Sequence, residues 1–170
     1  MVEQQYGFEF TEELIDEANL PSGGAYTAVG TYDHGEMISL LVILSEKTSL
    51  SIPALLRAYG HYLFKTFERS YPHFLKNADS AFAFLESIDQ HIHVEVKKLY
   101  PDAELPVFSS KRLSSDSLEL IYKSERKMGA FAQGLIEQSL VFFQEDARVS
   151  MENIMADGSE VRFTIEKTTL

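Results

Sequence analysis

The chain has 170 residues, of which 45% are hydrophobic and 24% charged, a balance typical of one soluble globular domain with a sizeable core. Its formal net charge is −11, which argues against a nucleic-acid-binding surface and against binding to an anionic membrane. Cysteine is absent, which excludes disulfides and thiolate metal sites and favours a cytoplasmic location. The N-terminus lacks the layout of a signal peptide, and no apolar run has the length of a membrane span.

Apolar residues recur at helical spacing through most of the first 70 residues. Thr11 is the expected N-cap of the first helix, and the Pro-Ser-Gly-Gly segment 21–24 ends it. The Tyr71-Pro72 pair stops the last of these helices, because the residue before a proline disfavours the helical conformation. The predicted elements are helices over 10–18, 35–50 and 52–70 and an extended stretch over 25–32.

A further helix is predicted to begin after Ser80, its expected N-cap, and to end at Tyr100. It carries His91 and His93. Since residues two apart on a helix point to nearly opposite sides, these two histidines are not expected to share a ligand. Pro106 lies in the link that follows the helix.

From residue 117 to 126 the pattern changes to alternation, which is typical of a strand. Tyr122, Ser124 and Arg126 then lie on one face and continue its apolar side. Polar groups that extend a buried face need polar partners, or their burial is unfavourable. This trio is therefore a candidate binding site for a polar group.

The remaining residues predict a helix over 129–145 and a hairpin formed by strands over 149–155 and 161–167. Gly134 in the middle of that helix disfavours it by roughly 1 kcal/mol relative to alanine, so we expect it to permit a close approach. The predicted fold is α+β, with a helical N-terminal half packed on a C-terminal antiparallel sheet that carries a long helix.

Several familiar site chemistries find little support in the sequence. A zinc site is disfavoured because no HExxH motif occurs and His91 and His93 diverge, and a serine hydrolase because no Gly-x-Ser-x-Gly motif occurs. No nucleophile and base pair is found, so we expect no enzyme. Asp89 lies four residues before His93 on the same helix face, either as a surface pair or beside a site without being a ligand. The other histidines, His34, His61 and His73, are expected to be structural or solvated.

Four features of the sequence together match a known family: the segment Ile92-His93-Val94-Glu95-Val96-Lys97-Lys98-Leu99-Tyr100-Pro101, Pro106, the Tyr122-x-Ser124-x-Arg126 signature, and Gly134-Leu135-Ile136. Weaker support comes from Ala25-Tyr26-Thr27 and Ser45-Glu46-Lys47. On these residues the chain resembles the haem–nitric oxide/oxygen binding (H-NOX) domains of bacteria, which are related to the haem domain of soluble guanylate cyclase.

The resemblance implies a haem b cofactor, iron protoporphyrin IX, in a pocket between the helical half and the sheet. His93 would bind the iron, and Pro106 would press on the porphyrin. A neutral imidazole is a good ligand for ferrous haem, and an arginine fork suits a propionate. The remaining expected haem contacts are Tyr122, Ser124 and Arg126 at the propionates and Leu63, Phe67, Phe131 and Leu135 at the pocket wall.

The resemblance further implies a sensor of NO, with CO as a second gas ligand. In the oxygen-binding members a tyrosine donates a hydrogen bond to O2, whereas the matching position here is Phe131. We therefore expect exclusion of O2 for lack of a distal donor. NO would break the His93–iron bond and free the helix from Phe82 to Tyr100. The signal would pass to a separate partner, typically a histidine kinase or a cyclic-di-GMP enzyme.

Two alternatives stay open at this point. One is a cofactor-free ligand-binding or protein-interaction module of the same fold, and the other is an O2-binding haem protein. Residues 1–170 are expected to form a single haem-binding domain. The family's first helix begins upstream of the segment that matches Tyr6-Gly7, so the start of that helix is expected to be missing here.

Overall fold

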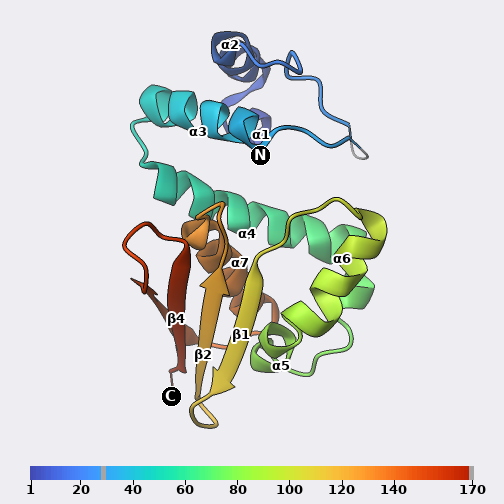
Figure 1. The fold of residues 1–170 in the computed structure, drawn as a ribbon, viewed down its shortest axis with the longest axis vertical. Coiled ribbons are helices and arrows are strands. Elements are labelled where there is room, and N and C mark those ends of the chain that lie inside the picture. The colour runs from blue at the N-terminus through green and yellow to red at the C-terminus, as the bar shows by residue number, and fades with distance from the viewer. Residues whose placement is uncertain (28–29, 169–170) are drawn as a thin grey trace. The chain divides into compact units, whose positions relative to one another are not determined.

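The computed structural model describes residues 1–27 and 30–168, which form two compact units, Met1–Leu55 and Leu56–Leu170. The element order is shown in Figure 1. Whether the two units act as the one expected domain stays a prediction. No single helix in the described part of the chain is long and apolar enough to cross a membrane, and α3 (His34–Thr48) with α4 (Ile52–Ser70) passes that test only when the two are counted together.

The first unit contains α1 (Val2–Tyr6), α2 (Phe8–Ala18) and α3. The predicted helix over 10–18 is confirmed as α2, but its N-cap is Gly7, so the prediction of Thr11 as the cap is wrong. The Thr11 hydroxyl instead donates to the carbonyl of Gly7, one turn earlier.

A buried carboxylate organises the segment between α2 and α3. Glu36 accepts hydrogen bonds from the amide and hydroxyl of Ser22 and from the Tyr26 hydroxyl. These bonds, with that from the Ser22 hydroxyl the strongest, lower the pKa of Glu36. Of the stretch expected to be extended, residues 28 and 29 lie outside the described residues, and the others form no strand.

The second unit opens with most of α4, as predicted, followed by the short 3-10 turn η1 (Pro72–Phe74). Ser80 then caps α5 (Ala81–Glu86), its hydroxyl accepting from the amide of Ala83 at 3.1 Å. The prediction of one unbroken helix from there to Tyr100 is wrong, because the π-helical turn η2 (Ile88–Ile92) interrupts it. Helix α6 (His93–Leu99) begins directly after this turn.

The sheet has four antiparallel strands in the order β1-β2-β4-β3. The strands are β1 (Val107–Arg112), β2 (Ser117–Lys123), β3 (Ala147–Asn153) and β4 (Glu160–Lys167). The predicted hairpin is confirmed as β3 and β4, whereas β1 was missed. Buried side chains from β2 and β4 face each other in register, because period-two alternation places them on one face. The pairs are Leu118 with Ile165, Leu120 with Phe163, and Tyr122 with Val161.

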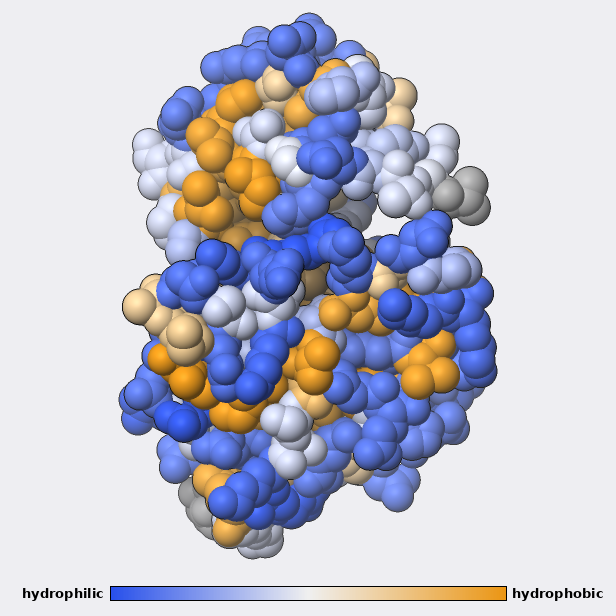
Figure 2. Space-filling view, viewed as in Figure 1, coloured by the Kyte–Doolittle hydropathy of each residue, from blue (hydrophilic) through white to orange (hydrophobic). Residues whose placement is uncertain are grey.

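Helix α7 (Gly129–Phe142) lies against this buried face of the sheet, behind the strands in Figure 1. Its residues Ala132, Ile136 and Leu140 belong to the same core cluster as the inward-facing strand residues. The expected close approach at Gly134 is confirmed, because a Cβ there would overlap the carbonyl oxygen of Arg57 in α4. Hydrophilic residues cover most of the face seen in Figure 2, in keeping with the net charge of −11.

Candidate functional site

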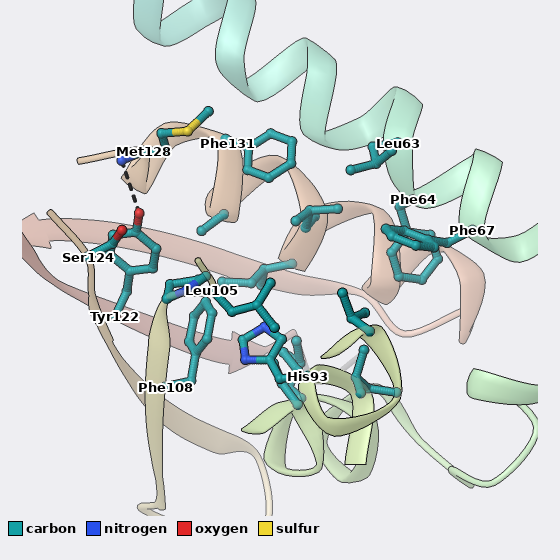
Figure 3. A pocket seen from close by; sticks show the side chains of 18 of the residues that line it. Leu63, Phe64, Phe67, His93, Leu105, Phe108, Tyr122, Ser124, Met128 and Phe131 are labelled. Atoms are coloured by element: carbon teal, nitrogen blue, oxygen red, sulfur yellow. Dashed lines mark hydrogen bonds between the residues drawn. The ribbon is translucent and has the colours of Figure 1, made fainter. Parts of the chain in front are cut away.

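One cavity of about 300 Å³ lies within the second unit. Pockets for small molecules measure roughly 300–1,000 Å³, so this cavity lies at the lower end of that range. Most of the residues that line it come from the helical elements α4, α5, η2, α6 and α7, from strand β2, and from the link that precedes β1 (Figure 3). All nine residues singled out from the sequence line it: Leu63, Phe67, His93, Pro106, Tyr122, Ser124, Arg126, Phe131 and Leu135.

His93 is the first residue of α6 and follows directly after η2. Its side chain is 18% exposed, whereas His91 is exposed. Burial lowers the pKa of His93, and nearby Asp89 opposes that shift. The pocket therefore favours the neutral imidazole, which is the form that binds a metal. In Figure 3 its ring lies on the opposite side of the cavity from Phe131 and Leu63.

Asp89 holds the ring of His93 in place. Its Oδ1 lies 3.0 Å from His93 Nδ1 and accepts a hydrogen bond of 3.1 Å from the amide of Phe108 at the start of β1. The pairing at a spacing of four was visible in the sequence, but the third partner was not, since Phe108 is 19 residues away. Because Nδ1 is engaged, Nε2 is the nitrogen left for a metal.

The strand that was to carry the polar trio is shorter than predicted. β2 ends at Lys123, so Tyr122 lies in the strand while Ser124 and Arg126 lie in the turn that follows. The turn includes Lys127 with a φ of 55°. The prediction that all three side chains lie on one strand face is therefore wrong for Ser124 and Arg126. The turn nevertheless returns both side chains to the cavity.

Tyr122 is 3% exposed, and its hydroxyl accepts a hydrogen bond of 3.0 Å from the amide of Met128 just before α7, the dashed line in Figure 3. A tyrosine hydroxyl both accepts and donates, so its hydrogen stays available for a second partner. Ser124 Oγ accepts from the amide of Arg126 at 3.2 Å and keeps its own hydrogen in the same way. Both hydroxyls at this end of the cavity can thus donate to an anion.

The guanidinium of Arg126 carries five N–H donors, and the described residues supply a partner for one of them. Its Nη2 donates to Glu104 Oε2 at 2.8 Å, while its Nε is buried and lacks a hydrogen-bond partner among the described residues. A buried donor without a partner is unfavourable and marks a place where a ligand group fits. An anionic oxygen beside Nε would satisfy it. Neither Glu104 nor its contact with Arg126 was anticipated from the sequence.

The other side of the cavity is apolar. Leu63 and Phe67 come from α4, and Phe131 and Leu135 from α7, with Tyr59 stacked on Phe131 at a ring distance of 5.3 Å. Tyr59 does not line the cavity, and burial raises the pKa of its hydroxyl. Among the lining residues that the structure describes, the ionisable, amide or hydroxyl side chains are His93, Glu104, Tyr122, Ser124 and Arg126.

The residues that line the cavity fit an iron porphyrin. One imidazole suits the iron, apolar walls suit the macrocycle, and the unpartnered Arg126 Nε suits a carboxylate. A multi-histidine metal site fits less well. Within residues 1–27 and 30–168, no three His, Asp or Glu side chains come together in a way that could hold an ion.

Comparison with known proteins gives the family. The haem-NO-binding family model matches residues 1–151. No curated protein matches the chain. The solved structures that resemble it include the unliganded Fe(II) H-NOX protein from K. algicida, with 42% identity, a TM-score of 0.94, and coverage of 99% of this chain and 91% of that one.

Two further structures were solved with gas ligands. The S. oneidensis H-NOX protein in the Fe(II)NO state has 25% identity and a TM-score of 0.91, covering 99% of this chain and 94% of that one. The Shewanella woodyi H-NOX in the Fe(II)CO state has 38% identity and a TM-score of 0.83, covering 98% and 88%. The family model spans most of the chain and the structural matches span nearly all of it. The chain therefore belongs to the H-NOX family of haem-NO-binding, gas-sensing domains.

Proposed function

We propose that this protein is a haem-based NO sensor that binds haem b in the cavity of the second unit. The observation that carries the proposal is the composition of that cavity. A single histidine lies on one side, apolar residues lie opposite, and Arg126 presents a buried Nε without a partner. Ferrous haem, when bound, supplies an open position for a diatomic gas and a bond to an imidazole.

His93 is the proposed iron ligand, through Nε2. Asp89 engages Nδ1 and so selects the tautomer that leaves Nε2 unprotonated. Tyr122, Ser124 and Arg126 are the proposed partners of the propionates, two hydroxyls as single donors and one guanidinium as a fork. Pro106 lines the cavity on the link that joins α6 to β1, where it would contact the porphyrin.

The apolar side supports selection of NO over O2. O2 affinity depends on a hydrogen-bond donor at the gas site, whereas NO binds ferrous haem without one. Leu63, Phe67 and Phe131 line that side, and none of them carries a donor. The relatives solved with NO and with CO show that both gases bind proteins of this fold, so we include CO as a second ligand.

We extend the proposal to signalling through release of His93. The residue lies at the junction of η2 and α6, where the amide of His93 bonds to the carbonyl of Ile88, five residues earlier. π-helical turns are rare and occur frequently at functional sites. Loss of the ligand bond would free α6 to move about this turn. The receiver would be a separate histidine kinase or cyclic-di-GMP enzyme, with the net charge of −11 steering a basic partner surface.

The absorption spectrum of the haem-loaded, reduced protein tests this proposal. We expect a Soret band that changes on addition of NO, and no stable ferrous–oxy spectrum in air-saturated buffer. His93→Ala should remove the imidazole's contribution to the spectrum, while the matched variant His91→Ala, at an exposed position, should leave it unchanged. A protein without a Soret band would instead be a cofactor-free module, and a stable ferrous–oxy spectrum in air would indicate an oxygen binder.

A further inference from the structure

Glu104 occupies an unusual position for an acidic residue in a pocket meant for an anion. It lies in the link between α6 and β1 and lines the same cavity as Arg126. Its Oε2 accepts from Arg126 Nη2 at 2.8 Å. The Glu104 side chain is 78% exposed, that of Arg126 36%. Arg126 is its only side-chain partner among the described residues.

The contact uses a donor that a bidentate carboxylate needs. Nε and Nη2 form one edge of a guanidinium, and a carboxylate that docks on this edge accepts from both. The protein contains such a pair elsewhere, since Arg112 donates from Nε at 3.0 Å and from Nη2 at 2.6 Å to the two oxygens of Glu86. Glu104 takes only Nη2 of Arg126 and leaves Nε unpaired.

We propose that Glu104 is a built-in competitor for Arg126, which weakens the hold of this site on a carboxylate-bearing cofactor. The inference rests on the proposed haem function and assigns a residue that sets its affinity. A propionate docking on Arg126 must displace Glu104 from Nη2 or lie beside its negative charge, and both effects oppose binding. Because Glu104 is exposed and makes one bond, it is poorly suited to the opposite role of holding the guanidinium rigidly for the ligand.

The test is Glu104→Gln in the full chain, measured by the rate at which haem passes from the protein to excess apomyoglobin. Exposed ion pairs contribute little, so we expect the variant to lose haem about two- to fivefold more slowly. The difference should shrink at high ionic strength. Asp102→Asn is the matched control, because it removes one negative charge from an exposed position of the same link. It should leave the rate unchanged.

Iron protoporphyrin dimethyl ester separates competition for the carboxylate from other effects, because it lacks free carboxylates. With this probe Glu104→Gln should match the wild type. The inference is overturned if Glu104→Gln loses haem at the wild-type rate, if it loses haem faster, or if the ester shows the same slowing. These results leave the proposed haem function standing when the wild type itself holds haem. A wild type that holds no haem overturns both.

Discussion

Gly134→Ala is expected to destabilise the protein, because Gly134 lies where α7 crosses α4. At this crossing a Cβ on Gly134 would overlap the carbonyl oxygen of Arg57 and come within 3.1 Å of Gly60 Cα. The reciprocal Cβ on Gly60 would come within 2.9 Å of the Leu135 amide nitrogen. Every neighbour is backbone, so no side chain can turn aside, and the two helices must separate.

The expected size follows from two opposing contributions. Overpacking at a tight contact costs about 1–3 kcal/mol, and backbone neighbours put this case in the upper half of that range. Alanine in place of a mid-helix glycine stabilises the helix by about 1 kcal/mol, which offsets part of this cost. We therefore expect net destabilisation of about 1–2 kcal/mol, which for a chain of this size lowers Tm by roughly 2–8 °C.

Urea unfolding of the haem-free protein measures this change in the free energy of unfolding. Ala58→Gly, at an exposed position of α4, is the control for helix propensity and should destabilise by about 1 kcal/mol. If Gly134→Ala instead stabilises the protein by about 1 kcal/mol, propensity alone governs the site and the packing argument is refuted. The variant should also weaken haem retention, because both helices carry apolar residues of the cavity wall.

Two further predictions concern the gas site and the first unit. Phe131→Tyr introduces a hydrogen-bond donor on the apolar side of the cavity and should raise O2 affinity by about one to two decades, as measured by gas titration of the reduced protein. Phe131→Leu is the control. An unchanged O2 affinity in the tyrosine variant would show that residue 131 does not face the gas. Since hydrogen bonds from Ser22 and Tyr26 lower the pKa of Glu36 from its ordinary value of 4.5, its stabilising contribution is present above that value and lost as the pH falls through the lowered one. Urea unfolding from about pH 6 to pH 3 should show a flatter acid limb in Glu36→Gln, and equal slopes in both proteins would contradict the role given to this carboxylate.

Local patterns in the sequence predicted the elements that carry the site. Helical spacing separated His91 from His93, and alternation placed Tyr122 on the buried face of a strand, because both periods follow from backbone geometry. The cost of a glycine within a helix predicted the close contact at Gly134, although not its partner. The family resemblance then assigned roles that no local pattern could assign.

Other features depended on contacts between distant segments. The strand pairing of β2 ends at Lys123, so a turn rather than a strand brings Ser124 and Arg126 to the cavity. The helix before His93 contains η2, which helical spacing does not distinguish from an α-helix.

The pairs formed by Asp89 with Phe108 and by Glu104 with Arg126 span 19 and 22 residues. Side-chain periodicity reports which face of an element is buried, because burial depends on the element's own geometry. It does not report which group lies opposite, because that depends on how the whole chain closes around its core.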